Sequence, residues 1–468
     1  MATAWLYSNR KDIPQQLEIG TCAHTGGEGK VFFSKDGKYA VKVYHGQKAG
    51  LEKHRLLEMV MLLGANLTKD EERFLCWPLA LVTNVDGSEC VGCVTRRIPT
   101  PPYTVLLNIM YTPREAAEQF RAGKSWANYL QVARGIARSI AVLHGKGCAH
   151  ADLHYGNFLV EPESGDVVLL DLDGLVVPGF LPPQVAGMYG FMAPEIVMEK
   201  SAPSERSDRH SLAVLVLYTL LFRNVMSPLL TYDPNNPEID ERIGWGKEAV
   251  FSEHPQDQRN RPRMLGVPLF RGGALSYHIL TPALQKLTER AFLEGLHNPD
   301  RRPSAREWIN TLSWALDELW QCSYCRQYFP YPHWIRPVER RVCPYCGQRR
   351  MVAPLPSVLL LYEPHGRGNY VFTQRHLVLG NGWKLFADVL DSQRNPPISR
   401  RDEPWIGHVE WDDKRKTNRL INDEAAIWRA RLGEDGTDII VGSGISVPLQ
   451  PETTIHFGEG RRLLVVKE

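Results

Sequence analysis

A short acidic stretch carries the residue types that phosphoryl transfer needs. Asp152 lies in CAHADLHYGN, Asn157 follows five residues later, and Asp171 ends the apolar run 167–170. Such a run is typical of a buried strand. One carboxylate can orient an attacking hydroxyl, while a second carboxylate and an amide oxygen can hold magnesium. The spacing therefore predicts a phosphoryl-transfer site, with an ordinary Asp/Asn-rich turn as the alternative.

Two motifs within this stretch and three outside it give it a recognisable context. HAD and DLDG resemble the HRD and DFG motifs of protein kinases. Upstream, GGEGKV resembles part of the kinase pattern GxGxxGxV, with His24 at the first glycine position. Downstream, APE and NPDRRP resemble the end of an activation segment and a late arginine motif. The resemblance covers residues 17–320 and implies an α+β, bilobal kinase-like fold with lobes at 17–98 and 99–320.

The N-terminal motifs imply where nucleotide phosphates would bind. Gly26, Gly27 and Gly29 precede Val31, and glycines let backbone N–H groups approach a phosphate closely. Lys42, in AVKVY, is expected to bind the α- and β-phosphates of ATP. A hairpin turn and a solvent-exposed strand lysine are the structural alternatives.

The resemblance also implies a partner for this lysine. Residues 51–63 have helical periodicity, and Glu58 occupies the position expected to pair with Lys42. Glu52 is the second choice.

Residues 91–98 are expected to form the strand that leads to the hinge between the lobes. Adenine would then pack near Val94 and Ile98. Cys90 and Cys93 on the same strand are expected to be packing residues, because free cysteine is often buried in apolar strands.

In the second lobe, Ser125 is expected to cap a long helix at 125–145 that leads into the catalytic loop. The resemblance implies that Asp152 orients the acceptor hydroxyl, and that Asn157 and Asp171 hold magnesium. Asp173 can assist Asp171 or cap the turn.

Two structural residues are implied as well. Asp208 is expected to hold the catalytic-loop backbone, and Arg302 is expected to pair with Glu195. Small-molecule kinases with HxD loops generally lack these features. They therefore favour our first hypothesis, a protein kinase, over our third, a small-molecule phosphotransferase.

Several residues depart from the kinase pattern. Ala151 replaces the HRD arginine, and Tyr189 is the only hydroxyl side chain between Gly174 and Glu195. Control by phosphorylation of a serine or threonine in this loop is therefore not expected. His154 and Met188 replace a lysine and a threonine that contribute to catalysis and substrate docking. These departures favour the second hypothesis, an inactive nucleotide-binding scaffold.

Two CxxC pairs follow the kinase-like region and predict a zinc ribbon at 321–352. The four candidate ligands are Cys322, Cys325, Cys343 and Cys346. Four thiolates complete a tetrahedron, so a structural zinc is expected. His333 can replace one cysteine, but we expect it to lie at the surface.

The ribbon is also rich in arginine, at positions 326, 336, 340, 341, 349 and 350. We favour protein docking over nucleic-acid binding for this basic module.

The remaining residues frame these modules. Residues 1–16 are expected to be an N-terminal extension, and 353–357 a proline-rich linker. Short segments with Gly, Asn and Asp turns predict a β-sandwich at 358–468. Its closing strands are faintly similar to those of forkhead-associated domains. We expect a degenerate copy of such a domain that does not bind phosphate.

Composition adds few constraints. At 468 residues with a net charge of +2, the chain suits two or three globular domains and indicates no charged partner. No signal peptide is evident, the apolar run 212–222 is too short to span a membrane, and the paired cysteines suit a reducing cytoplasm.

The motif set as a whole resembles the kinases of the tellurite-resistance-associated TerY-P phosphorylation triad. That resemblance implies ATP- and magnesium-dependent phosphorylation of Ser or Thr in a protein substrate. It also implies a von Willebrand A-type protein and a metal-dependent phosphatase as partners.

Overall fold

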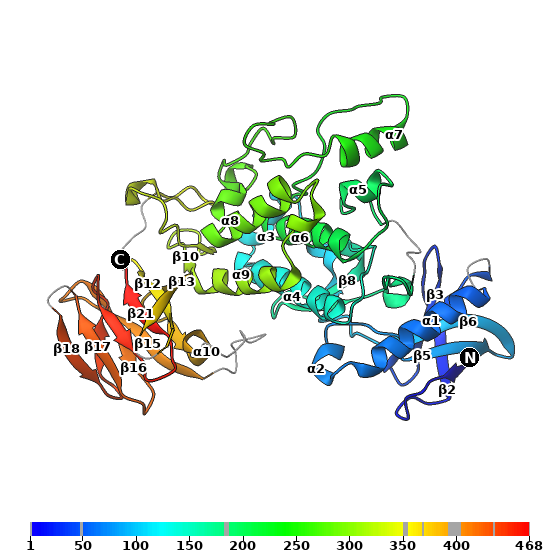
Figure 1. Cartoon of the computed structure of the whole chain (residues 1–468), viewed down its shortest axis with the longest axis horizontal. Helices are drawn as coiled ribbons and strands as arrows, with labels where there is room; N and C mark the ends of the chain where they lie inside the picture. The colour runs from blue at the N-terminus through cyan, green and yellow to red at the C-terminus, as the bar shows by residue number, and fades with distance from the viewer. Residues whose placement is uncertain are drawn as a thin grey trace.

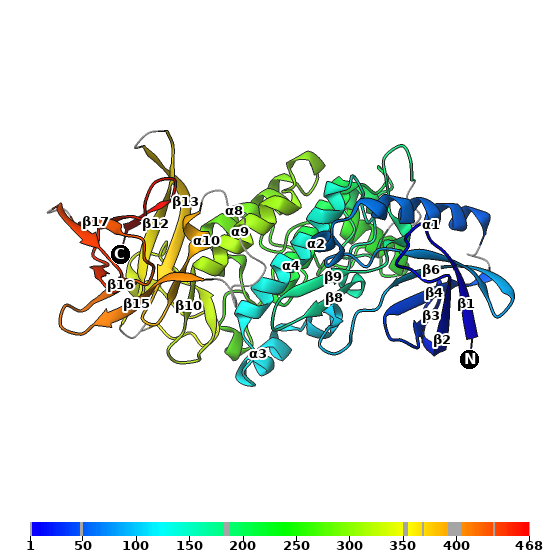
Figure 2. The ribbon, with the colours of Figure 1, turned by 90° about the horizontal axis from the view of Figure 1, so that it is seen from below.

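The computed structural model describes residues 2–46, 50–181, 187–349, 354–366, 369–391, 404–433 and 436–467. Figures 1 and 2 show a barrel lobe at one end, a helical lobe in the middle and a pair of β-sheets at the other end. Among the helices of these ranges, none is long and apolar enough to cross a bilayer.

The N-terminal lobe is a closed barrel in the order β1-β2-β3-β4-β6-β5. Its strands are β1 (Ala2–Tyr7), β2 (Gln16–Thr25), β3 (Gly29–Ser34), β4 (Tyr39–Tyr44), β5 (Ala80–Val85) and β6 (Ser88–Arg96). Alternate residues such as Ile19, Val41 and Val94 fill its interior, as the two-residue period of a strand requires. Helix α1 (Leu51–Leu63) packs against it through Leu57 and Met61, and the short α2 (Lys69–Glu72) follows.

The barrel includes residues that the sequence assigned to an extension. Strand β1 pairs with both β2 and β5, so it closes the barrel. Its interior position is the small Ala4, whereas Trp5 and Tyr7 are exposed. Ala2 and Leu6 pack against the same core as Ala4, so β1 keeps the two-residue period, and residues 2–16 are part of the lobe.

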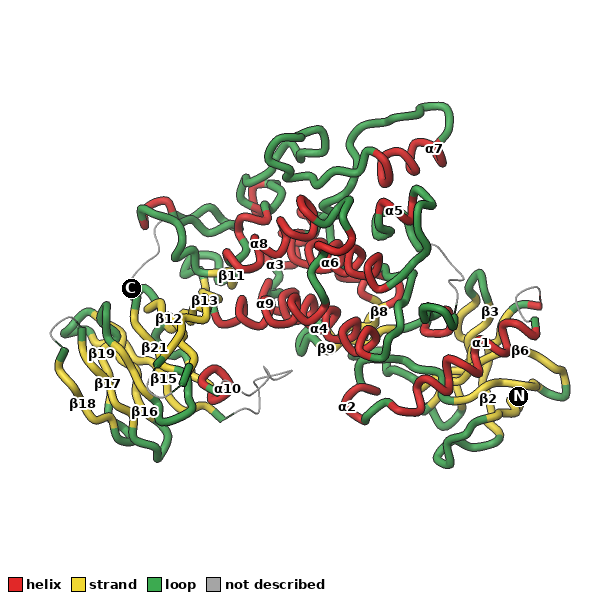
Figure 3. The backbone as a smooth tube through the Cα atoms, viewed as in Figure 1, coloured by secondary structure: helices red, strands yellow, loops and turns green. Residues whose placement is uncertain are grey.

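The C-terminal lobe is built on three helices, α4 (Trp126–Gly145), α6 (Glu205–Leu221) and α9 (Ala305–Asp317). The remaining elements are α3 (Pro113–Arg121), α5 (Pro194–Val197), α7 (Pro237–Arg242), α8 (Pro282–Glu289) and a small sheet of β7 (Thr104–Val105), β8 (Phe158–Glu161) and β9 (Asp166–Leu169). The predicted cap is confirmed, because Ala127 N donates to Ser125 Oγ. The connection between α6 and α8 is mostly loop (Figure 3).

A buried ion pair stabilises this lobe. Both guanidinium nitrogens of Arg302 lie 2.7 Å from the carboxylate oxygens of Glu195. The Arg302 side chain is 1% exposed and also donates to backbone carbonyls of Gly295 and Leu296. The predicted pairing of Arg302 with Glu195 is confirmed.

The ribbon packs into the helical lobe. Strands β10 (Leu319–Gln321) and β11 (Tyr328–Pro330) pair, and Phe329 and Tyr345 belong to the same apolar core as α4 and α6. The amide of Gln327 receives a bond from Trp126 N and donates to the carbonyl of Lys124. This part of the ribbon therefore contacts the helical lobe of the same chain.

The last part consists of two antiparallel sheets around one core, which includes Leu359, Leu420 and the fully buried Trp428. One sheet has the order β13-β12-β21-β20-β17-β18 and the other β14-β15-β16-β19. The bounds are β12 (Ser357–Pro364), β13 (Tyr370–Leu379), β14 (Lys384–Phe386), α10 (Ala387–Leu390), β15 (Trp405–Asp412), β16 (Thr417–Asn422), β17 (Trp428–Leu432), β18 (Thr437–Val441), β19 (Ser446–Pro448), β20 (Thr454–His456) and β21 (Leu463–Val466).

We predict that Glu195→Ala lowers the free energy of unfolding by roughly 3–5 kcal/mol, because it leaves the buried guanidinium of Arg302 without its carboxylate. Urea denaturation measures the change. The control is Asp300→Ala, which removes an exposed pair with Arg206 and should cost less than about 1 kcal/mol. Equal losses in the two variants would contradict this role for Glu195.

Candidate active site

One buried carboxylate holds the loop between α4 and β8. Asp208 is 1% exposed and accepts bonds from the backbone N–H groups of His150 at 2.7 Å and Ala151 at 3.1 Å. His144 Nε2 lies 3.1 Å from the same carboxylate. Ala151 has a φ of 69°, a left-handed conformation that turns the chain. The predicted role of Asp208 is confirmed.

The loop brings Asp152 and Asn157 together. Asn157 Nδ2 donates to the carbonyl oxygen of Asp152 at 2.9 Å. His154 Nε2 lies 3.7 Å from Asp152 Oδ2. The Asp152 side chain is 28% exposed, so it remains accessible to a second molecule.

The same loop holds the end of β9. Leu170 N donates to Asn157 O at 2.8 Å, and His150 Nε2 lies 2.9 Å from Leu170 O. Asp171 follows with a left-handed φ of 58° and begins a short turn of 3₁₀-helix. The structure therefore places Asn157 beside the residue that precedes Asp171, as the sequence predicted.

Lys42 links the barrel lobe to this turn. Its Nζ lies 2.6 Å from Asp171 Oδ1, 2.9 Å from Asp173 Oδ2 and 3.4 Å from Glu28 Oε2. Burial lowers the pKa of Lys42, but the charges of Asp173 and Asp171 raise this pKa by more, so the ammonium stays charged. Burial likewise raises the pKa of Asp171, and the Lys42 charge and hydrogen bond bring that pKa below its ordinary value.

Glu58 does not take the role predicted for it. In the described part of the chain, the carboxylates that pair with Lys42 are those of Glu28, Asp171 and Asp173. Glu52 is exposed and does not pair with Lys42 either.

Helix α1 presents a second lysine to the cleft in place of a glutamate. Lys53 Nζ lies 3.2 Å from Asp173 O and 3.6 Å from Asp173 Oδ2. Glu58 lies five residues further on, about 140° around the helix from Lys53. Burial and the neighbouring charge of Lys42 lower the pKa of Lys53. Lys53 shares the face of the buried Leu57, four residues on, so the apolar pattern of α1 was a signal that could have found it.

A cavity opens between the barrel and the acidic turn. It is lined by Val31, Ala40, Lys42, Cys76, Pro78, Cys93, Thr95, Leu170, Asp171, Leu172 and Asp173. This apolar wall with a charged end suits a planar ring attached to phosphates. Val31 therefore lies where the sequence predicted.

The two residues predicted beside adenine do not line the cavity themselves, although Cys93 and Thr95 of strand β6 do. Lys42 pairs across the sheet with Cys93, and Val41 pairs with Val94. Because faces alternate along a strand, Cys93 shares the cavity face of Lys42 while Val94 points into the barrel core. Ile98 is buried in a cluster with Val168 and the cavity-lining Cys76. Cys93 is thus a cavity residue, and burial raises the pKa of its thiol to about 11.

The three loop glycines have different roles. A Cβ on Gly29 would lie 2.3 Å from Val43 O, so glycine is required there by the contact between β3 and β4. Gly26 N donates to Gly29 O at 2.9 Å and closes the turn. Gly27 lies at the exposed tip with open space around it. Gly29 is therefore a packing residue of the barrel, whereas Gly26 and Gly27 form the exposed turn.

The acidic groups beside the cavity bring Glu28, which the sequence did not predict, together with the predicted ligand Asp171 and with Asp173. Oxygens of Glu28, Asp171 and Asp173 lie within 4.8 Å of one another. Carboxylate oxygens are the ligands that magnesium prefers, so this donor set fits the ion. Asn157 lies next to the group and can add its side-chain oxygen, which accepts no hydrogen bond from the described residues.

The activation segment returns to the catalytic loop at Gly187. A Cβ at this residue would lie 3.0 Å from Ala151 O and 3.8 Å from Asp152 Oδ1. Gly187 has a φ of 107°, which also favours glycine. Met188, which follows it, is exposed.

The four ribbon cysteines converge as predicted. Their sulfurs lie within 4.8 Å of one another, with Cys322 and Cys346 at 3.8 Å and Cys325 and Cys343 at 3.6 Å. Each CxxC turn is closed by a backbone hydrogen bond. Arg326 N donates to Cys322 O, and Gly347 N donates to Cys343 O. The donor set and its closed shape fit a structural zinc.

The expectation that His333 lies at the surface is wrong. It is 2% exposed, and its Nε2 lies 2.9 Å from Glu318 Oε2. Arg341 is equally buried and donates to Tyr331 Oη at 2.8 Å, so it is not part of a basic surface. Arg350 and the start of the linker at 353 lie outside the described residues.

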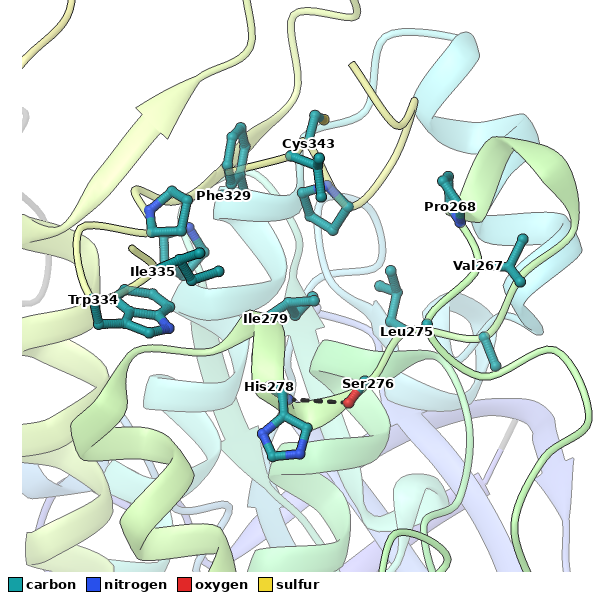
Figure 4. Close-up of a pocket in the computed structure, with 16 residues that line it drawn as sticks. Val267, Pro268, Leu275, Ser276, His278, Ile279, Phe329, Trp334, Ile335 and Cys343 are labelled. Atoms are coloured by element: carbon teal, nitrogen blue, oxygen red, sulfur yellow. Dashed lines mark hydrogen bonds between the residues drawn. The ribbon is translucent and has the colours of Figure 1, made fainter. Parts of the chain in front are cut away.

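A second hollow lies between the ribbon and the connection that precedes α8 (Figure 4). Val267, Pro268, Leu275, Trp334 and Ile335 give it an apolar lining. It contains none of the carboxylates described above, so we assign the candidate active site to the cavity at Lys42.

Comparison with known proteins gives this geometry a context. Residues 114–312 match a family model described as "Protein kinase domain". This range includes Asp152, Asn157 and Asp171 but not Lys42 or the glycine loop.

Two relatives extend the comparison. "Protein kinase YegI" of Escherichia coli (strain K12) is 26% identical over 335 residues, which cover 69% of this chain and 47% of that protein. An "EPD1-interacting receptor-like cytoplasmic serine/threonine-protein kinase" of Nicotiana benthamiana is 26% identical over 197 residues, 40% of this chain and 38% of that protein. The chain thus matches less than half the length of each of these curated relatives.

Among solved structures, a rhoptry kinase from Toxoplasma gondii matches with a TM-score of 0.42 and 14% identity. The match covers 68% of this chain and 85% of that one.

We predict that Asp208→Ala loosens the catalytic loop, because it removes the acceptor for two backbone N–H groups. The loss should be about 1–3 kcal/mol for each buried donor left unpaired. Amide hydrogen exchange at His150 and Ala151 measures it. Asp86→Ala, which removes an exposed acceptor for Thr3 N, should leave this loop unchanged. Unchanged protection in Asp208→Ala would contradict the tether.

Proposed function

We propose, from the premise that the chain contains a protein kinase domain, that it transfers the γ-phosphate of ATP to a Ser or Thr of a protein, with magnesium. The observation that carries the proposal is the contact of Lys42 with Asp171 and Asp173, at 2.6 and 2.9 Å. That contact joins the two lobes at the open end of the cavity. The serine/threonine specificity is supported by the name of the plant relative alone.

The charges at this contact are complementary to a magnesium–triphosphate. Lys42 offers one cation to phosphate oxygens, and Glu28, Asp171 and Asp173 offer anionic oxygens to the metal. In the protein alone, the ammonium of Lys42 pairs with these three carboxylates. Magnesium supplies charge neutralisation on the phosphates when bound, and Asp171 is the ligand we propose first, with Asn157 beside it.

Asp152 is proposed to orient the acceptor hydroxyl. Its carboxylate is partly exposed, and the Asp208 tether fixes the backbone before it. His154, at 3.7 Å, takes the place of the usual lysine, and its charge depends on protonation. We propose that His154 orients Asp152 and assists at the phosphate only when protonated.

Regulation by a phosphorylated activation loop is not part of the proposal. The segment from Gly174 to Glu195 contains no Ser or Thr, and Ala151 cannot pair with a phosphate. The site is proposed to be competent without that modification.

The alternative is a catalytically inactive scaffold. One observation favours it: α1 offers Lys53, not a glutamate, to the cleft, so two ammonium groups share the neighbourhood of Asp173. Such a site can bind nucleotide phosphates without aligning them for transfer.

The accessory parts belong to the same proposal. We propose that the four cysteines hold a structural zinc, which is supported by their convergence. We further propose a likeness of the terminal sheets to forkhead-associated domains, a cytoplasmic location, and von Willebrand A-type and phosphatase partners. The sequence motifs alone support these points.

Transfer is tested by incubating the full chain with labelled ATP, magnesium and a generic protein substrate. Asp171→Asn removes the proposed metal ligand and Asp152→Asn the hydroxyl-orienting carboxylate, and each should reduce transfer at least about 100-fold. Asp166→Asn, in the same segment but paired with Arg73, is the matched control and should retain activity.

Equal transfer by all four proteins would contradict the proposed roles. Binding of ATP by the native chain with no transfer to any protein would favour the scaffold. Transfer to small alcohols, without transfer to protein, would favour the small-molecule phosphotransferase.

A further inference from the structure

Three parts of the chain meet at a third cluster of metal-ligating side chains. Glu318 directly follows α9, His333 lies between the two cysteine pairs of the ribbon, and His376 lies on β13 of the terminal sheets. One ligand atom from each lies within 4.8 Å of the others. The sequence gives no spacing that connects these residues, because they are brought together only by the packing of three modules.

Glu318 and His333 are buried and held by neighbouring bonds, whereas His376 is partly exposed. Glu318 is 3% exposed and His333 is 2% exposed. His333 Nε2 lies 2.9 Å from Glu318 Oε2, and the rings of His333 and His376 are 4.2 Å apart. Backbone bonds from Tyr331 N to Glu318 O and from His333 N to Tyr331 O hold the first two residues in register. The side chains are therefore positioned before any ligand binds.

Cations of the protein also lie near the cluster. Lys467 Nζ is 3.5 Å from His333 Nδ1, and Arg341 donates to His333 O at 3.3 Å. Next to the cluster, Arg375 pairs with Asp317 at 3.2 Å across the same junction of α9 and β13. The competing explanation is thus a metal-free polar cluster in which Lys467 supplies the positive charge.

We propose that Glu318, His333 and His376 bind a zinc ion, separate from the four-cysteine site, that joins the helical lobe, the ribbon and the terminal sheets. Two imidazoles and one carboxylate are an established zinc donor set, with ligand atoms about 2.0–2.2 Å from the ion. Ligand atoms in such a site are about 3.3–3.5 Å apart by tetrahedral geometry. The ligand atoms of the cluster already lie within 4.8 Å of one another. Three protein ligands leave one position for water.

The count of bound zinc tests the proposal on the full chain. The protein is dialysed against zinc chloride and then against metal-free buffer, and zinc is measured by mass spectrometry of the metal. We expect two equivalents in the native chain and one in His376→Ala. Cys343→Ser should also retain one equivalent, held by the cluster. His456→Ala, a histidine of β20 outside the cluster, is the matched control and should retain two.

Cobalt substitution identifies which site is lost. Cobalt bound by four thiolates gives intense sulfur-to-metal charge-transfer absorption, whereas a site of two histidines and a carboxylate does not. His376→Ala should keep the thiolate absorption, which also shows that the ribbon is folded, while losing one equivalent of cobalt. A single equivalent in the native chain, or an unchanged count in His376→Ala, would overturn the proposal and leave the metal-free cluster with Lys467.

Discussion

The candidate site depends on one ion-paired contact between the lobes. Lys42 comes from the barrel, and its ammonium lies 2.6 Å from Asp171 and 2.9 Å from Asp173, which follow the last strand of the helical lobe. The pairing raises the pKa of Lys42 and lowers that of Asp171, so each group keeps the charge that the other requires. The barrel register fixes the lysine, since β4 pairs with β6 at Lys42 and Cys93.

The other half of the contact is fixed by hydrogen bonds that begin at Asp208. This buried carboxylate holds the backbone at His150 and Ala151, and His150 in turn lies against Leu170 O, one residue before Asp171. Asn157 N–H₂ and the backbone of Leu170 complete the connection between the catalytic loop and the acidic turn. The positions of the catalytic loop and the acidic turn are therefore set by hydrogen bonds to backbone groups more than by side-chain packing.

The sequence predicted the residues that act through short, local motifs. Asp152 contacts Asn157, Lys42 contacts Asp171, and the four cysteines converge at a separate site. The motifs predicted these contacts because their spacing constrains a loop or a tight turn directly. The long-range pair of Arg302 and Glu195 was predictable only through resemblance to kinases.

The failures have a common physical cause. Val94 was assigned without the strand period that turns it inward, and Glu58 without the helical face defined by Leu57. Glu28 enters the site through tertiary packing, for which the motifs give no signal, and Lys53 was signalled only by the apolar face of α1. The burial of His333 is of the same kind, because it depends on the contact between the ribbon and the terminal sheets.

The central claim is that Lys42 and Asp171 together form a magnesium–nucleotide site, and calorimetric titration of ATP tests it most directly. The account predicts that the native chain binds ATP in the presence of magnesium and binds it much more weakly when the metal is chelated. It predicts that Lys42→Met abolishes this binding, whereas Lys35→Met, on an exposed pair with Glu18, does not. Binding that is independent of both magnesium and Lys42 would contradict the account.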